Sequence, residues 1–265
     1  VNIIHAHMFH TLVIASFLKL FNQKLRVVFT PHNSFYSMQI RRLILWILKP
    51  FRDIDTVFSK SAVSFFHKGS PAIIPNGIDI NDYLKTNKDL TIQSFTFIVI
   101  GRLELMKNHR FLIDEISKLK DYDFKVKIVG SGVLEDLLKK QVSFLKLGHK
   151  IEFLGSRNDV PLLLNQSDCL LLPSLWEAFP IVLLEAAASD IPVITTPVGS
   201  ISSFVDYESG YVVELNSFRN AMIEVMTNRK EARMKSNILH KKVKSNYHIS
   251  DIVKQYESIY LKIVK

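Results

Sequence analysis

The residues best suited to chemistry in this chain are two cations and several glycines, which follow short apolar runs. Arg102 and Lys107 follow one such run, and Gly130-Ser131-Gly132 follows the next. Arginine offers a planar fork and lysine a point charge, and both suit a diphosphate. Glycines let a backbone approach a phosphate closely, although the third glycine of the dinucleotide fingerprint is missing here. These residues indicate an anion site, with a solvated pair and a plain tight turn as the alternatives.

The segment from Glu177 to Glu185 is the most informative part of the sequence. Pro180 suits the first position of a helix, where its missing N–H costs nothing. The N–H groups of Ile181 and Val182 would then point at an anion bound at the helix start. Glu185 is a carboxylate in an otherwise apolar helix, which favours hydrogen bonds to hydroxyl groups such as those of a ribose. A structural cation as the partner of Glu185 is the alternative.

Candidate metal ligands are few and poorly placed. His5 and His7 end an apolar run of period two, so both rings are expected on one face, and His32 follows the next run. A zinc site is not favoured, because no cysteine or carboxylate nearby completes the ligand set, and a buried, hydrogen-bonded histidine is the alternative. The Asp-x-Asp triplets 53–55 and 121–123 precede expected strands, the wrong end for ligand binding. We interpret both as turns and predict no metal.

The elements that must position these residues follow from the apolar pattern. Runs rich in β-branched residues alternate with amphipathic stretches, which predicts βαβ units and an α/β fold with parallel, doubly wound sheets. The expected strands are 1–5, 26–30, 55–58, 72–75, 95–100, 125–129, 151–154, 169–172, 192–195 and 210–214. The expected helices are 10–21, 39–48, 61–67, 111–119, 133–147, 160–166 and 181–188. Ligands bind beyond the carboxyl ends of such strands, where the glycines, cations and carboxylates converge.

The chain divides into four expected segments. Residues 1–75 would form an N-terminal unit and residues 76–93 a polar linker. Residues 94–227 would form a second Rossmann-like domain, and residues 228–265 a helical tail. A hydrophobic content of 48% with 22% charged residues rules out a disordered chain. The chain begins with Val1 in an expected strand, which does not resemble a signal peptide.

Several motifs, taken in order, resemble the retaining GT-B glycosyltransferases of family 4. The motifs are Ile74-Pro75-Asn76-Gly77-Ile78-Asp79, Gly101-Arg102 with Lys107-Asn108, Gly130-Ser131-Gly132, Glu177-x-Phe-Pro with Glu185, and Pro197-Val198-Gly199. The match covers about residues 1–215, with Ser200 where many relatives have a second glycine. The resemblance implies a GT-B fold of two Rossmann-like domains. The N-terminal domain would be incomplete, because that of the family normally begins several strands earlier.

The resemblance also implies a donor site for a nucleoside-diphosphate sugar that uses neither a metal nor another cofactor. Arg102 and Lys107 would bind the diphosphate and stabilise the leaving group. Glu185 would bind the ribose, while Glu177 and His7 would face the donor sugar. Further donor contacts would come from Gly101, Gly130, Gly132, Arg157, Phe179, Pro180, Ile181 and Val182. The tail would cross back to the N-terminal domain.

The function implied is transfer of a sugar, with retention, to a saccharide or lipid-linked hydroxyl acceptor in bacterial surface polysaccharide assembly. Two alternatives are a sugar-nucleotide epimerase on the same fold and a truncated chain that binds nucleotide without catalysis. Nucleic-acid binding ranks last, because the middle of the chain is acidic and no recognition motif is present.

The net charge of +9 is unevenly distributed along the chain. Residues 1–75 hold 9 basic and 2 acidic side chains, and residues 228–265 hold 10 basic and 3 acidic. The stretch 39–51 places basic residues around apolar ones, as a helix lying on a membrane would, with a solvated core helix as the alternative. No apolar run reaches the ~18 residues of a membrane span, and the single cysteine indicates a reducing compartment. We therefore predict a cytoplasmic protein that docks peripherally on an anionic membrane.

Overall fold

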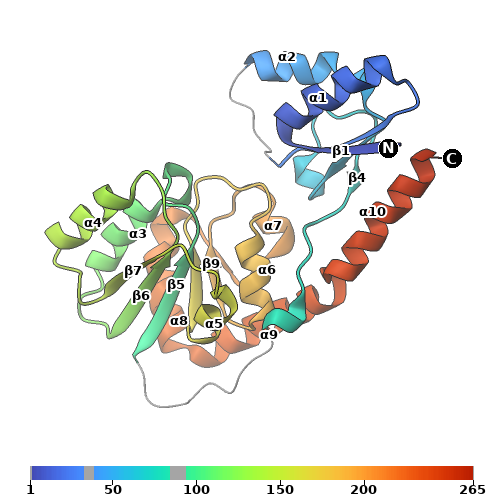
Figure 1. Ribbon diagram of the computed structural model, residues 1–265. Helices are drawn as coiled ribbons and strands as arrows, with labels where there is room; N and C mark the ends of the chain where they lie inside the picture. Colours follow the sequence, from blue (N-terminus) through green and yellow to red (C-terminus); the bar gives the residue numbers. More distant parts are fainter. Residues whose placement is uncertain (1, 33–38, 84–93, 265) are drawn as a thin grey trace. The chain divides into compact units, whose positions relative to one another are not determined.

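A computed structural model describes residues 2–32, 39–83 and 94–264 (Figure 1), which divide into two compact units. Unit 1 comprises Val1–Gly77, Glu177–Phe179 and Ile249–Lys265, and unit 2 comprises Ile78–Trp176 and Pro180–His248. Each strand expected from the sequence is present, with its ends displaced by no more than two residues. Both units are built on parallel sheets, so the expected α/β class is confirmed.

Unit 1 contains a four-stranded parallel sheet in the order β1-β2-β3-β4. Its strands are β1 (Ile3–His7), β2 (Arg26–Thr30), β3 (Ile54–Val57) and β4 (Ala72–Ile73). Its helices are α1 (Met8–Phe21), α2 (Gln39–Ile47) and α10 (Ile249–Val264). β1 ends at His7 rather than at His5, so His7 is the last residue of the strand.

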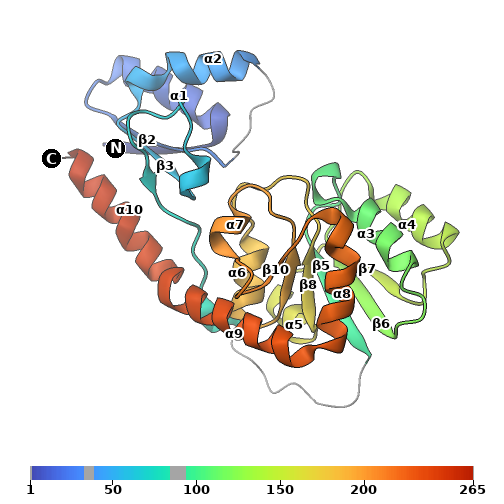
Figure 2. The same ribbon diagram turned by 180° about the vertical axis from the view of Figure 1, so that it is seen from behind.

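The two faces of this sheet differ in chemistry because side chains alternate along each strand. Ala6, Val27 and Phe29 pack in one apolar cluster with Leu12 of α1 and Leu45 of α2. The opposite face carries the polar side chains of His5 and Thr30, which contact each other and α10. Figures 1 and 2 show α1 and α2 together on one side of the sheet.

The helix expected over residues 61–67 does not form, and the chain there has only a 3-10 turn at Lys60–Ala62. Local side-chain hydrogen bonds explain the difference. His67 Nδ1 accepts the N–H of Ser64 at 2.9 Å, and the hydroxyl groups of Ser59 and Ser61 lie 2.8 Å apart. A side chain that bonds nearby backbone, as His67 does here, competes with helix formation.

An ion pair between two fully buried side chains links α2 to β3 in unit 1. Arg52 Nη1 donates to Asp55 Oδ2 at 2.8 Å, and both side chains are completely buried. Arg52 Nη2 also donates to the carbonyl groups of Leu45 at 3.1 Å and Phe66 at 2.7 Å. Asp55 also accepts the N–H of Lys68 at 2.8 Å. The triplet that contains Asp55 therefore serves the core of unit 1.

Unit 2 contains a six-stranded parallel sheet in the order β10-β9-β8-β5-β6-β7, the doubly wound arrangement. Its strands are β5 (Phe95–Ile100), β6 (Phe124–Val129), β7 (Ile151–Gly155), β8 (Cys169–Leu172), β9 (Val193–Thr195) and β10 (Tyr211–Val212). Its helices are α3 (His109–Ser117), α4 (Glu135–Phe144), α5 (Val160–Asn165), α6 (Ile181–Ala188), α7 (Ile201–Phe204), α8 (Phe218–Thr227) and α9 (Arg229–Asn246). Strand order reverses between β5 and β8.

Helices cover both faces of this sheet (Figure 2). The side chains of α3, α4 and α8 pack with Phe97 and Val126 in one buried cluster, while α5 and α6 contact each other on the other side. Residues on both faces of β5 and β8 are buried, which explains their continuous apolar runs. Of the expected helical tail, α9 belongs to unit 2 and α10 to unit 1. In the expected linker, Ile80–Tyr83 forms a 3-10 turn, and residues 84–93 lie outside the described part of the chain.

We predict that Arg52→Met destabilises unit 1 by about 3–5 kcal/mol, because it leaves the buried carboxylate of Asp55 without its cation. Urea unfolding followed by circular dichroism measures the change. The control is Arg26→Met, which removes a partly exposed partner of Asp53 while Lys19 still binds that carboxylate. We expect Arg26→Met to cost less than about 1 kcal/mol. Equal losses in the two variants would contradict the role assigned to the buried pair.

Candidate functional site

The reversal of strand order between β5 and β8 marks the edge where a ligand is expected to bind. The loop after β5, residues 101–108, carries Arg102 and Lys107 at this edge. The N–H of Leu175, in the loop after β8, donates to the carbonyl oxygen of Met106 at 2.8 Å. The two loops that flank the reversal are therefore joined by a backbone hydrogen bond.

The glycines after β6 permit a second loop to pack against the loop after β5. Gly130 has a φ of +133°, and a Cβ atom there would lie 2.0 Å from the carbonyl oxygen of Gly101. A Cβ atom at Gly132 would lie 2.6 Å from the carbonyl oxygen of Leu103. The N–H of Leu103 in turn donates to the carbonyl of Ser131 at 3.0 Å. These glycines therefore hold the Arg102 loop in place, and their approach to a phosphate stays a prediction.

The two cations of this loop differ in their surroundings. The side chain of Arg102 is 71% exposed and donates to Glu104 Oε1 at 2.8 Å. An exposed pair of this kind contributes less than about 1 kcal/mol, so an anionic ligand would displace the carboxylate at little cost. The side chain of Lys107 passes close to Gly101, where an added Cβ atom would lie 3.1 Å from Lys107 Cε. The structure thus brings Arg102, Lys107 and Gly101 together, as the sequence predicts.

Helix α6 spans the expected residues Ile181–Ala188, but Pro180 does not occupy its first helical position as the sequence suggested. Pro180 has φ −74° and ψ 116°, an extended conformation, and serves as the N-cap instead of the first helical residue. Its carbonyl accepts the N–H of Leu183 at 3.1 Å. The first N–H groups of a helix have no acceptor inside it, and this applies to Ile181 and Val182. Their binding of an anion stays a prediction.

Glu185 has a partner that sequence reasoning missed. The hydroxyl of Tyr83 donates to Glu185 Oε1 at 2.9 Å. Burial raises the pKa of Glu185, and the hydrogen bond from Tyr83 opposes that rise. An aromatic residue at the end of a polar stretch was the only signal for Tyr83 in the sequence. The partner of Glu185 is thus a hydroxyl group, the kind expected from a ribose, whose binding stays a prediction.

Arg157 is held at the end of β7 by a two-pronged ion pair. Its Nε donates to Asp159 Oδ1 at 2.8 Å and its Nη2 to Asp159 Oδ2 at 2.6 Å. The neighbouring hydroxyl of Ser156 lies 2.9 Å from that of Ser131 in the loop after β6. Arg157 is therefore fixed close to the Gly130–Gly132 loop, and its contact with a base stays a prediction.

The remaining candidates belong to unit 1. His7 ends β1, and its Nδ1 lies 2.9 Å from Nε2 of His32. Burial lowers the pKa of both imidazoles, so both are uncharged at neutral pH. Glu177 is 6% exposed, and the carbonyl of Phe179 accepts a hydrogen bond from Asn76 Nδ2 at 3.2 Å. His7, Glu177 and Phe179 are thus grouped in one unit, and the diphosphate and ribose candidates in the other.

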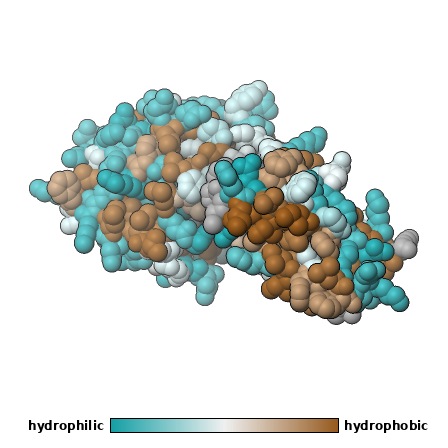
Figure 3. Space-filling model, turned by 90° about the horizontal axis from the view of Figure 1, so that it is seen from above, coloured by the Kyte–Doolittle hydropathy of each residue, from teal (hydrophilic) through white to brown (hydrophobic). Residues whose placement is uncertain are grey.

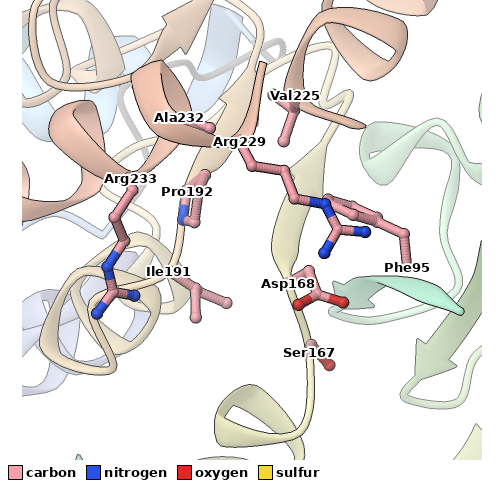
Figure 4. A pocket seen from close by; sticks show the side chains of 9 residues that line it. All are labelled: Phe95, Ser167, Asp168, Ile191, Pro192, Val225, Arg229, Ala232 and Arg233. Carbon is pink, nitrogen blue, oxygen red and sulfur yellow. The ribbon is translucent and has the colours of Figure 1, made fainter. Parts of the chain in front are cut away.

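A pocket of about 140 Å³ lies at the other edge of the unit 2 sheet (Figure 4). Its lining includes Phe95 and Asp168, which lie at the amino ends of β5 and β8, and Arg229 of α9. Asp168 there accepts the N–H of Thr96 at 2.8 Å. Ligands of doubly wound sheets bind at the carboxyl ends, so this pocket is not the donor site. Within the described residues, no group of three or more His, Cys, Asp or Glu side chains is arranged to hold a metal ion.

Comparison with known proteins finds one matching family model and several related sequences. The family model described as glycosyl transferases group 1 matches residues 85–241. The UDP-Gal:alpha-D-GlcNAc-diphosphoundecaprenol alpha-1,3-galactosyltransferase of Escherichia coli is 30% identical over 211 residues, which are 73% of this chain and 54% of that protein. The N-acetylgalactosamine-N,N'-diacetylbacillosaminyl-diphospho-undecaprenol 4-alpha-N-acetylgalactosaminyltransferase of Campylobacter jejuni is 29% identical over 229 residues, 80% of this chain and 62% of that protein. The chain thus spans little more than half the length of these curated relatives.

The solved structures support the fold. HepE of Anabaena in complex with UDP-glucose superposes with a TM-score of 0.91 at 20% identity, covering 98% of this chain and 79% of that one. Sucrose-phosphate synthase from Thermosynechococcus elongatus superposes with a TM-score of 0.89 at 17% identity, covering 99% and 73%. These likenesses confirm the expected GT-B fold class.

We predict that Tyr83→Phe raises the pKa of Glu185 further, because it removes the hydrogen bond that stabilises the ionised carboxylate. Protonation of Glu185 on acidification then begins at a higher pH than in the unaltered chain. Carbon-13 NMR titration of the carboxyl groups, assigned with Glu185→Gln, measures the shift. The control is Tyr207→Phe, an exposed tyrosine whose hydroxyl bonds Glu208. A titration of Glu185 unchanged by Tyr83→Phe would contradict the contact.

Proposed function

Because the chain belongs to the glycosyl transferases group 1 family, we propose that it transfers a sugar from a nucleoside-diphosphate donor to an acceptor hydroxyl. The loop at the strand reversal carries this proposal, since it presents Arg102 and Lys107 at the carboxyl edge of the unit 2 sheet. The donor class is supported by the UDP-Gal donor named for the Escherichia coli relative and by UDP-glucose in the HepE complex.

The leaving group is the nucleoside diphosphate, on which negative charge develops as the bond to the sugar breaks. Arg102 and Lys107 would neutralise this charge, and the N–H groups at the start of α6 would add to their effect. With two cations in this role, we propose catalysis without a metal ion or other cofactor. Glu185 would accept hydrogen bonds from the ribose.

The donor sugar would be contacted by Glu177 and His7. We propose that transfer proceeds with retention of anomeric configuration, as in glycosyltransferases of family 4, on the strength of the motif Glu177-x-Phe-Pro with Glu185. We propose that unit 2 binds the nucleoside diphosphate of the donor and that unit 1 binds the acceptor.

The acceptor is proposed to be a saccharide or a lipid-linked sugar in bacterial surface polysaccharide assembly. The Escherichia coli and Campylobacter jejuni relatives are both named for acceptors linked to diphosphoundecaprenol. A third relative, N-acetyl-alpha-D-glucosaminyl L-malate synthase of Bacillus anthracis, is 26% identical over 224 residues and is named for a small acceptor. The first two relatives are named as transferases, which disfavours an epimerase or a nucleotide-binding chain without catalysis.

A lipid-linked acceptor would require the protein to reach a membrane surface from the cytoplasm. Apolar side chains of α1 and α2, among them Phe17, Phe21 and Trp46, are more than half exposed, and Figure 3 shows the apolar face over these helices. Arg41 and Arg42 of α2 lie beside them. No helix among the described residues is long and apolar enough to cross a bilayer. We therefore propose peripheral docking of unit 1 on anionic lipid.

We predict that Arg102→Ala lowers the transfer rate about 100-fold, because a charge-stabilising donor is lost, and that Glu185→Ala raises the donor KM about tenfold. Incubation with a panel of nucleotide sugars, read by mass spectrometry, measures both. Arg219→Ala, which removes an exposed arginine of α8 that pairs with Glu115, is the control. Unchanged donor turnover in both site variants would refute the site. Donor conversion without acceptor-dependent product would instead favour an epimerase.

We predict that replacing Arg41 and Arg42 together by Gln weakens binding to phosphatidylglycerol vesicles about tenfold or more, since each cation near an anionic surface contributes about 1 kcal/mol. Vesicle sedimentation measures the change. The control replaces Lys24 and Lys60 by Gln, which removes the same charge elsewhere in the same unit. Vesicle binding that depends on neither anionic lipid nor salt would contradict the docking proposal. Equal losses in both double variants would show that net charge, not this surface, matters.

A further inference from the structure

Three histidine rings lie in contact at the carboxyl ends of β1 and β2 in unit 1. The ring centroids of His5 and His7 are 4.1 Å apart, and those of His7 and His32 are 5.1 Å apart. His7 is the exposed member of the three, while His5 is half-buried behind it. Only His7 has a role in the proposed reaction, which leaves the purpose of the other two rings to be explained.

Both ring nitrogens of His5 are held by other side chains. His5 Nδ1 lies 2.6 Å from the hydroxyl of Tyr260, on α10. His5 Nε2 lies 2.7 Å from Oγ1 of Thr30, whose hydroxyl also bonds that of Thr56 on β3. Two short hydrogen bonds on opposite sides of an imidazole fix the plane of the ring, because any rotation about its χ2 angle would break both. His5 is thus a rigid surface against which His7 packs.

The hydrogen bond between His7 and His32 limits which nitrogen of His7 is open to a ligand. His7 Nδ1 lies 2.9 Å from His32 Nε2, so one of these nitrogens donates and the other accepts. In either arrangement His7 Nδ1 is occupied, and Nε2 is the nitrogen left for a further contact. If His32 donates, then His7 carries its proton on Nε2 and presents an N–H.

The charge state of the three rings follows from their closeness. Burial and the positive charges that His7 and His32 would carry lower the pKa of His5 to about 4. Burial also lowers the pKa of His7 and of His32, and His7 adds to the effect at His32. Among the described residues, the other titratable groups that face His5 are Tyr256 and Tyr260, and burial raises the pKa of the Tyr260 hydroxyl. At neutral pH the rings therefore interact as neutral groups, with each proton on one nitrogen.

We propose that His5, His32 and Tyr260 are positioning residues for His7, which they hold in one ring orientation with only Nε2 open to the donor sugar. The contact with the sugar rests on the proposed function, whereas the orientation of His7 is a property of the free chain. The C-terminal helix α10 thereby takes part in the site through a hydroxyl 253 residues away from His7 in the sequence.

The first test measures the histidine rings without any substrate. Long-range ¹H–¹⁵N spectra of the 265-residue chain report the protonated nitrogen of each imidazole, with assignments from His5→Gln, His7→Gln and His32→Gln. We expect Tyr260→Phe to shift the ring nitrogens of His5 and His7. The control is Tyr256→Phe, one turn earlier on α10, whose ring contacts His5 at 5.3 Å but whose hydroxyl does not bond it. Unshifted signals in Tyr260→Phe, or equal shifts in the control, would overturn the proposal.

The second test measures the reaction. We expect Tyr260→Phe to lower kcat about 3- to 10-fold with a donor KM changed less than about twofold, as expected for the loss of one hydrogen bond behind the reacting group. His32→Gln retains a side-chain amide able to donate to His7, so it should retain more activity than His32→Phe, which keeps a ring without the hydrogen bond. Equal activity in the two His32 variants would overturn the part assigned to His32. Shifted NMR signals in a chain with no transferase activity would refute the proposed function and leave the positioning intact.

Discussion

A backbone contact with no room for a side chain joins the loops after β5 and β6 in unit 2. Gly130 approaches the carbonyl of Gly101 so closely that a Cβ atom would lie 2.0 Å from it, and Gly132 approaches Leu103 in the same way. Alanine at either position would force the loops after β5 and β6 apart. The position of Arg102 depends on this contact, because its own side chain is exposed and makes only a weak pair with Glu104. The backbone contact beneath Arg102 therefore fixes the position of the loop that carries this exposed cation.

Unit 1 packs polar side chains on both sides of a small parallel sheet. On the side of α2, Arg52 and Asp55 bond each other and nearby backbone groups. On the side of α10, His5 and Thr30 continue into a row of side-chain hydrogen bonds that ends at Tyr260. Buried polar groups are tolerated only when hydrogen-bonded, so both arrangements specify one packing of helix on sheet. The second arrangement ends beside His7, whose ring packs against that of His5.

Local sequence signals predicted the strands closely. They did not predict the structure of residues 61–67 or the long-range partners of Tyr83 and Tyr260. Apolar, β-branched runs such as 95–100 gave β5 without error, because burial on both faces leaves a continuous pattern. The helix expected at 61–67 does not form because the His67 side chain bonds the nearby backbone of Ser64, which hydrophobic periodicity does not reveal. Tyr83 and Tyr260 were missed for another reason. Their partners lie 102 and 255 residues away, and no local pattern encodes such a contact.

The positive charge of unit 1 can be understood from the ion pairs that its acidic residues form. The segment 1–75 has only two acidic residues, and both are engaged: Asp53 binds Lys19 and Arg26, and Asp55 binds Arg52. Arg41 and Arg42 of α2 instead lie over the rings of Phe9 and Phe66. A basic balance spread along the sequence would attract any polyanion. In unit 1, cations lie on aromatic rings beside exposed apolar side chains. This combination favours a partner with an anionic surface and an apolar interior. A lipid bilayer fits this description better than a nucleic acid does.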